Sequence, residues 1–157
     1  MAKRLVVHVE LSGKLPAGVV EADLQKWCRA TLLEAKAKPM AYAVGLRMTD
    51  DEEVRKLNLE YRGKDATTDV LSFAHEEVGK WEVESGKTAS RNLGDIVISL
   101  PQVRRQAKMI GRRTQDELAL MVVHGTLHLL GFDHESLEDE TRMFAIQHQV
   151  LEKLKVV

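Results

Sequence analysis

Three histidines lie close together in the segment 121–135, MVVHGTLHLLGFDHE, which is otherwise largely apolar. His124 and His128 are four residues apart, so on a helix their imidazoles project from one face, a spacing at which both can bind one metal ion. Gly131 can adopt the left-handed conformation that ends a helix, and the turn brings His134 back toward the other two. Neutral imidazole is also tolerated in an apolar wall far better than a fixed charge. The sequence therefore predicts a metal centre with three nitrogen ligands.

The complete spacing, H-x-x-x-H-x-x-G-x-x-H, matches the extended zinc motif of metzincin proteases. Those proteases carry a glutamate directly after the first histidine as the general base, whereas this chain has Gly125. Peptidase chemistry is therefore not expected. Packed core histidines are the competing interpretation, but three ligands with the glycine at matching spacing favour a metal. Three protein ligands leave the coordination open, as in catalytic rather than structural sites.

The ligand type favours one Zn²⁺ ion, although imidazole also suits nickel, copper or iron. Asp133, beside the third ligand, has two interpretations. It either orients a ligand or accepts a proton from bound water, or it is a turn residue before the last helix. The sequence does not decide between them.

Alternating strand and helix patterns must position these ligands. Apolar runs and turn signals predict strands at 4–11, 41–48, 68–74 and 94–100. Helical spacing and capping signals predict helices within 16–38, at 49–61, starting at Ser99, starting at Thr114, and at 137–154. The polar stretch 75–93 is the predicted mobile loop. Together, these elements predict a single α+β domain over residues 1–157, with a mixed sheet of about four strands, about five helices and a metzincin-like metal helix.

Composition sets broad limits on partners. With 157 residues, 44% hydrophobic and 30% charged, the chain has the balance of a globular domain with its own core. A net charge of −1 offers no argument for nucleic-acid binding, and no apolar run is long enough for a bilayer. The N-terminus reads as a strand rather than a signal peptide, so we expect a cytoplasmic protein without membrane partners. The lone Cys28 is expected to be buried for packing.

Three blocks of the sequence resemble the YbeY family of metal-dependent endoribonucleases. HGTLHLLGFDH resembles its signature, LNLEYRGKDATTDVLSF its N-x-x-Y-R-x-K-D-x-x-T-D-V-L-S-F segment, and NLGDIVIS its L-G-D-I-x-I-S strand. The resemblance covers about residues 41–135, and the three blocks follow one another along the chain in the same order as in the family. One departure follows the second block, where Ala74 and His75 stand in place of the family's usual proline. His75 is expected to be a surface loop residue.

The resemblance implies a single-strand-selective endoribonuclease of the bacterial cytoplasm. It implies that the substrate is ribosomal RNA, notably the 3′ end of the small-subunit RNA, and that the protein contributes to ribosome quality control. The implied partners are single-stranded RNA and the small ribosomal subunit, with no DNA expected. Carried over by position, the metal ligands are His124, His128 and His134, and the functional arginine is Arg62.

An RNA phosphodiester needs a cation to stabilise charge developing on phosphorus. Arg62 is the candidate because its planar fork suits phosphate, and Lys64 adds a more distant point charge. Because position 125 lacks a glutamate, the hypothesis is that cleavage proceeds without a dedicated glutamate base. Either water activated by the ion attacks phosphorus, or the ion stabilises attack by a 2′-hydroxyl; a 2′,3′-cyclic phosphate product would exclude the former.

A basic stripe is the second candidate RNA contact. Arg104, Lys108 and Arg112 recur at i, i+4 and i+8 in the segment VRRQAKMIGRR, on one face of a predicted helix. Such runs are also common on solvated surfaces, so both interpretations stand. Asp69 and Asp95 stand near strand starts and are expected to cap turns rather than to catalyse.

Two alternatives to the ribonuclease remain. One is a metalloprotease-like hydrolase of peptides or small amides, since the ligand spacing is shared. The other is a non-enzymatic ribosome assembly factor whose metal only stabilises the fold; chelation would then unfold it.

Overall fold

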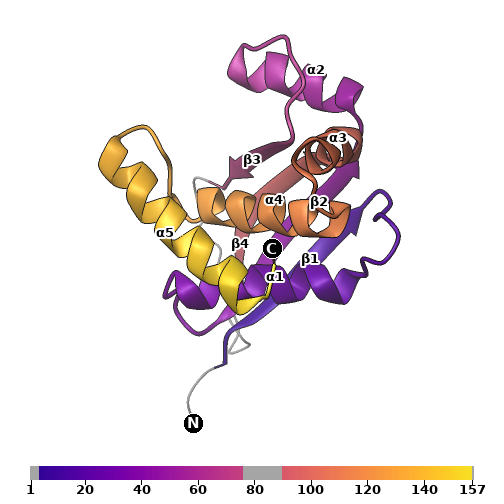
Figure 1. Cartoon of the computed structure of the whole chain (residues 1–157). Helices are drawn as coiled ribbons and strands as arrows, with labels where there is room; N and C mark the ends of the chain where they lie inside the picture. The colour runs from indigo at the N-terminus through magenta and orange to yellow at the C-terminus, as the bar shows by residue number, and fades with distance from the viewer. Residues whose placement is uncertain (1–3, 76–89, 157) are drawn as a thin grey trace.

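The computed structural model describes residues 4–75 and 90–156. The strands are β1 (Val6–Ser12), β2 (Ala41–Thr49), β3 (Val70–Ala74) and β4 (Ser90–Ser99). The helices are α1 (Glu21–Glu34), α2 (Asp51–Arg62), α3 (Leu100–Ile110), α4 (Thr114–Leu129) and α5 (Leu137–Lys153). The predicted α+β domain with a four-stranded mixed sheet and five helices is confirmed (Figure 1).

The sheet has the strand order β1-β2-β4-β3. β1 pairs with β2, and β2 with β4, in parallel; β3 is antiparallel to β4 and forms an edge. Parallel neighbours need crossover connections, and helices of the predicted alternation provide them. The short antiparallel β3 thus lies beside β4 at the edge where the helices α2 and α4 approach it.

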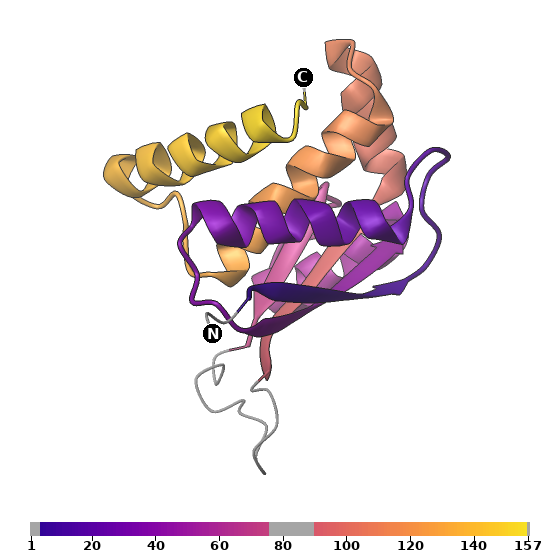
Figure 2. The same cartoon turned by 90° about the horizontal axis from the view of Figure 1, so that it is seen from below.

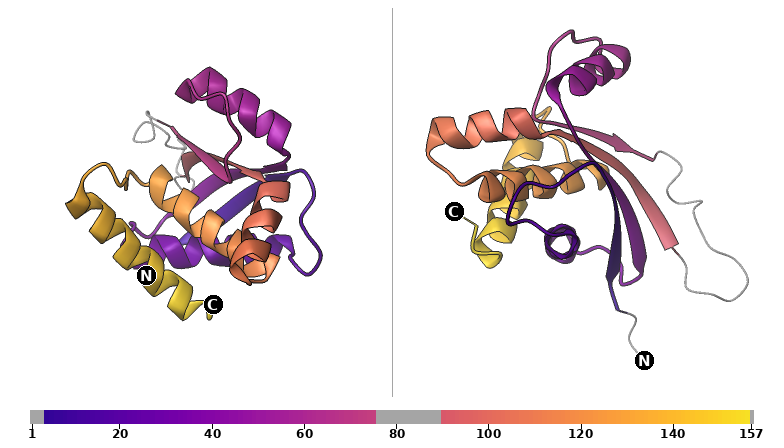
Figure 3. Two further views of the ribbon diagram at one scale, coloured as in Figure 1. Left: turned by 45° about the horizontal axis from the view of Figure 1, so that its top comes forward. Right: turned by 90° about the vertical axis from the view of Figure 1, so that its right-hand side faces the viewer.

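Alternating side chains divide the sheet into two faces. One face carries residues such as Val44, Leu46 and Ile96, all buried against α1 and α4. Figures 2 and 3 show α1, α4 and α5 together on this side of the sheet. On the other face, Leu71 and Val97 pack against Val54 of α2. A helix on each face therefore flanks the β3 edge.

Helix α4 is the centre of the core. Its buried residues face the sheet and α1 in one cluster, and α5 in a second cluster that includes Val123 and Leu127. Cys28 on α1 is fully buried and close to Thr126 Oγ1, and burial raises the pKa of its thiol to about 11. The packing role predicted for Cys28 is confirmed.

Two predicted boundaries were wrong. Asp50, not Thr49, caps α2, with its carboxylate accepting from the Glu53 N–H at 3.0 Å. The predicted start of α4 at Thr114 is confirmed, but Thr114 does not cap the helix, because Arg113 occupies the N-cap position without a side-chain hydrogen bond. β4 begins at Ser90 inside the predicted loop 75–93; residues 76–89 of that loop lie outside the described residues. Ser99 does cap α3, by accepting from the Gln102 N–H at 3.4 Å.

Candidate metal centre

The last turns of α4 carry the first two histidines. His124 and His128 lie one helical turn apart, with their Nε2 atoms 3.1 Å from each other. Gly131 has φ +97° and its N–H donates to the His128 carbonyl at 3.0 Å, so the chain leaves the helix there. The predicted turn at Gly131 is confirmed.

The turn brings His134 back to the helix. Its ring centroid lies 6.1 Å from that of His124 and 5.5 Å from that of His128. One nitrogen from each ring can be chosen so that all three lie within 4.8 Å of one another. Three nitrogens at this spacing can converge on one ion.

Protonation also suits metal binding. Burial lowers the pKa of His124 below its usual value. Burial, followed by the neighbouring charges of His124 and His134, lowers the pKa of His128 to about 4. Both rings are therefore neutral near pH 7 and offer lone pairs. The donor set of three imidazoles, two of them neutral and half-buried, fits a transition-metal ion such as zinc.

Gln147 on α5 fixes the orientation of His124. Its Oε1 lies 2.8 Å from His124 Nδ1, so Nδ1–H donates to the amide and Nε2 is left with its lone pair toward His128. No pattern in the sequence distinguishes Gln147 as a site residue. It is one of many polar residues on the predicted last helix, and only the packing of α5 against α4 shows which of them reaches the site.

The histidines line a cleft of about 810 Å³ between α4 and strand β3. We call it the histidine cleft. Besides His124 and His128, it is lined by residues 68–74, by the segment 131–135 and by Arg62. The structure thus brings together the three predicted metal ligands and the predicted functional arginine.

Arg62 reaches the cleft from the last turn of α2. Gly63 ends that helix with φ +71°, and the Arg62 side chain lies across strand β3. Its Nη2 donates to the Ser72 carbonyl at 2.6 Å, and its Cζ lies 5.2 Å from the centroid of the Phe73 ring. A guanidinium has five N–H donors, so these contacts fix the side chain and leave donors for an anion.

Gly125 lies where α4 touches the sheet. A Cβ at this position would lie 3.0 Å from Ile96 Cγ2 and 3.2 Å from Ser72 Oγ. Ser72 Oγ also donates to the Gly125 carbonyl at 3.3 Å. A side chain at the position of the protease glutamate would therefore press on Ile96 and Ser72, which would have to move by a few tenths of an ångström; this crowding favours glycine here.

The other predicted cations do not line the histidine cleft. Lys64 is exposed beyond the end of α2. Arg104 and Lys108 are exposed on α3, which adjoins the start of α4, the end opposite the histidines. The predicted i, i+4, i+8 stripe is wrong at its third member: α3 ends at Ile110, and Arg112 lies beyond the helix with its Nη1 3.1 Å from the buried Glu117 Oε1.

Carboxylates near the site have local roles. Asp69 lines the cleft, and its Oδ1 accepts from the Val70 N–H at 2.8 Å, as predicted for a strand-start cap. Asp133 also lines the cleft, and its Oδ1 accepts from the Glu135 N–H at 3.3 Å, as in a turn. The prediction for Asp95 is wrong: β4 begins at Ser90, so Asp95 lies within the strand rather than at its start, and it is exposed in a different hollow. His75 is not among the cleft-lining residues.

Comparisons with known proteins identify relatives of this chain. The family model described as endoribonuclease YbeY matches residues 12–155. The protein named endoribonuclease YbeY in Geobacillus kaustophilus (strain HTA426) is 47% identical over 151 residues, which cover 94% of this chain and 96% of that protein. Its namesake in Halalkalibacterium halodurans is 46% identical over 112 residues, or 70% of each chain.

A solved structure shares the fold. The solution structure of TM1509 from Thermotoga maritima superposes with a TM-score of 0.57 at 23% identity, covering 94% of this chain and 92% of that one. The family model spans both the cleft-forming elements and the three histidines. The chain belongs to the YbeY endoribonuclease family.

Proposed function

We propose that this protein is a metal-dependent, single-strand-selective endoribonuclease that cleaves ribosomal RNA. The observation that carries the proposal is the shared cleft: three convergent histidine nitrogens and the side chain of Arg62 line the same hollow. A nitrogen-rich metal site beside a fixed cation suits a phosphodiester, which carries negative charge that increases in the transition state. The names of the relatives support the same activity.

His124, His128 and His134 would hold the ion, and zinc is the proposed metal. When bound there, the ion supplies Lewis acidity toward a phosphoryl oxygen and activates water. Gln147 keeps His124 in the tautomer that leaves Nε2 available. The buried helix around the first two ligands excludes water from one side of the site.

Arg62 binds the phosphate in this proposal. Its Ser72 and Phe73 contacts hold the guanidinium at the cleft rim, so little side-chain freedom is lost when the phosphate arrives. Since position 125 is a glycine in a crowded contact, the residues of this chain supply orientation and charge rather than a protease-type base.

The biological setting is part of the same proposal. We assign the protein to maturation of the small-subunit RNA 3′ end and to ribosome quality control in the cytoplasm, with the small subunit as partner. Membership of the YbeY family supports this assignment. Separately, none of the helices within residues 4–75 and 90–156 has the length and apolar character needed to span a membrane.

Metal removal and reloading test the proposal. The purified protein is stripped with a chelator, reloaded with zinc, and supplied with an unstructured RNA, the same RNA in a duplex, and casein. We expect cleavage of the single strand only, lost on stripping and restored by zinc. Cleavage of casein instead would support the protease alternative. A chelated protein that unfolds, with no RNA cleavage after reloading, would support the assembly-factor alternative.

A further inference from the structure

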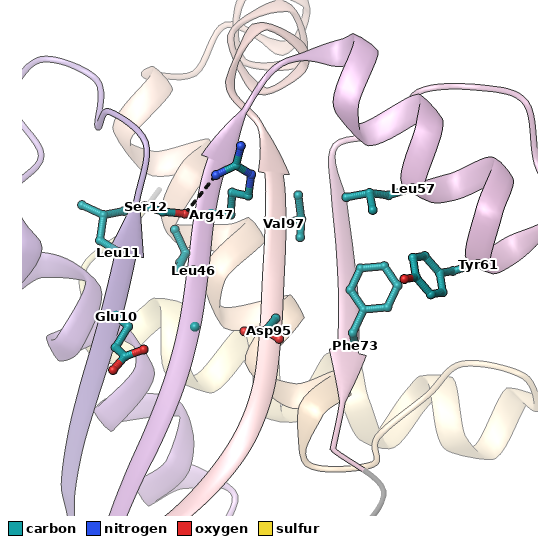
Figure 4. A pocket seen from close by; sticks show the side chains of 11 residues that line it. Glu10, Leu11, Ser12, Leu46, Arg47, Leu57, Tyr61, Phe73, Asp95 and Val97 are labelled. Atoms are coloured by element: carbon teal, nitrogen blue, oxygen red, sulfur yellow. Dashed lines mark hydrogen bonds between the residues drawn. The ribbon is translucent and has the colours of Figure 1, made fainter.

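A second hollow adjoins the histidine cleft on the opposite face of the sheet. It has a volume of about 590 Å³ and lies between α2 and the strands (Figure 4). We call it the sheet-face groove; its lining residues are Glu10, Leu11, Ser12, Gly45, Leu46, Arg47, Leu57, Tyr61, Phe73, Asp95 and Val97. Phe73 lines both hollows, so only the edge strand β3 separates them.

Two aromatic rings form the end of the groove next to that edge. Tyr61 and Phe73 face each other from α2 and β3, with ring centroids 5.3 Å apart and an interplanar angle of 65° (Figure 4). The Arg62 guanidinium lies over the Phe73 ring at 5.2 Å. Phe73 is therefore already in contact with two side chains, whereas Tyr61 is 59% exposed. Tyr61 therefore has exposed ring surface on which a further planar group can stack.

The charges of the groove exclude a phosphate. Glu10 on β1 and Asp95 on β4 are exposed carboxylates on the floor of the groove, one on each side of Gly45 of β2. Arg47, its one lining cation among the described residues, is already paired with Glu53, with Nη2 to Oε2 at 3.0 Å. A neutral, planar group suits this hollow better than an anion, because the unpaired charge here is negative. The phosphate-binding cation, Arg62, stands at the boundary with the other hollow.

We propose that the sheet-face groove binds a nucleobase of the RNA strand whose phosphate is held at Arg62, with the base stacked on Tyr61. This inference rests on the proposed ribonuclease function. Arg62 and Tyr61 are adjacent in sequence, and both contact the ring of Phe73, so one nucleotide can reach from the cation to the aromatic ring. Aromatic stacking accepts any base, and it requires an unpaired one. The groove thus gives a physical basis for selecting single strands.

The test measures single-turnover cleavage by zinc-loaded protein on a short unstructured RNA. Tyr61→Ala is expected to raise the RNA concentration for half-maximal rate about tenfold, with the maximal rate little changed, since a stacked base is worth roughly 1–3 kcal/mol. Tyr61→Phe keeps the ring and is expected to behave like wild type. Leu59→Ala is the matched control, because Leu59 is also exposed on α2, at 51%, but does not line the groove.

An abasic scan separates stacking from a structural effect. One abasic position near the cleavage site is expected to weaken wild type about as much as Tyr61→Ala does, and to have no further effect in that variant. Equal half-maximal concentrations for wild type and Tyr61→Ala would overturn the inference. So would a Tyr61→Ala defect that is the same for every abasic substrate, which would point to distortion or to a protein partner for the groove. If zinc-loaded wild type fails to cleave RNA at all, the proposed function fails instead.

Discussion

Gln147 Oε1 lies 2.8 Å from Nδ1 of His124, on the side of the ring away from the nitrogen that faces His128. The bond joins α5 to the metal-binding face of α4. A partner at the second ring nitrogen fixes both the rotation of an imidazole and its tautomer, so α5 contributes to the metal centre without supplying a ligand.

Replacing Gln147 by Leu is therefore expected to weaken zinc binding by about 10- to 100-fold. Gln147→Glu keeps an acceptor for Nδ1–H and should retain the affinity. Competition with a chromophoric chelator measures both. Gln149→Leu is the control, because Gln149 is exposed on the same helix. Wild-type zinc affinity in Gln147→Leu would show that the hydrogen bond does not position His124.

Gly125 is expected to tolerate no large side chain. Gly125→Glu forces a side chain against Ile96 and Ser72, where even a Cβ would be at 3.0–3.2 Å. Overpacking of this kind costs about 1–3 kcal/mol of unfolding free energy. Denaturant titration measures the loss, with the exposed Ala145→Glu as control. A Gly125→Glu protein of normal stability that acquires casein hydrolysis would contradict the geometry described here.

Asp51, the first residue of α2, links this helix to β4 and α3. Its Oδ1 accepts from Ser99 Oγ at 2.7 Å and its Oδ2 from Arg105 Nη2 at 2.7 Å. These contacts, the Ser99 hydrogen bond first, hold the pKa of Asp51 below its ordinary value. A carboxylate with a depressed pKa stabilises the fold above the unfolded-state pKa of about 4 and loses that contribution as the pH falls through the folded value.

Asp51→Asn should therefore lower the unfolding free energy at pH 7, by about 1 kcal/mol or less because the group is partly exposed. The difference from wild type should shrink as the pH falls below about 4. Thermal unfolding across this range measures it, with Glu52→Gln as a control of equal charge change at an exposed ion pair. A difference that stays constant with pH would mean that the carboxylate charge contributes nothing.

Arg104 and Lys108 remain predicted contacts for the RNA backbone. Both are exposed on α3, so the double alanine variant should fold normally. If each side chain neutralises one phosphate, the slope of log affinity against log salt falls by about 1.4 for a single strand, and the cleavage rate at saturating RNA stays unchanged. An unchanged slope would mean that both side chains are only solvated and do not contact the RNA backbone.

Much of the fold could be predicted because local patterns determine it. The alternation in 41–48 and the apolar run in 94–100 identify the central strands, and Gly131 marks the end of the metal helix. Helix starts were less certain, since Thr49 and Asp50 are both good caps and only the folded turn selects Asp50. Arg112 was misplaced because the glycine at 111 ends α3 with φ +72°, which helical spacing alone does not reveal.

Some residues of the candidate site could be predicted from local sequence patterns, and others could not. The three histidines could be predicted because their ligand spacing lies within one helix and the turn after it. Gln147 and the contact of Arg62 with Ser72 depend on how distant segments pack. Nothing in the order of residues indicates which polar side chain of α5 will meet His124.

The central claim is that the histidine ligands and Arg62 have separate roles in one cleft. It is tested most directly by RNA cleavage with measured zinc content in wild type, His128→Ala, Arg62→Ala and the control Arg104→Ala. The account predicts that His128→Ala loses both zinc and cleavage, whereas Arg62→Ala keeps one zinc and loses cleavage by about 100-fold or more, in the range for removing a transition-state charge contact. Arg104→Ala should keep both zinc and the saturated cleavage rate. Undiminished cleavage by zinc-free His128→Ala, or by Arg62→Ala, would contradict the account.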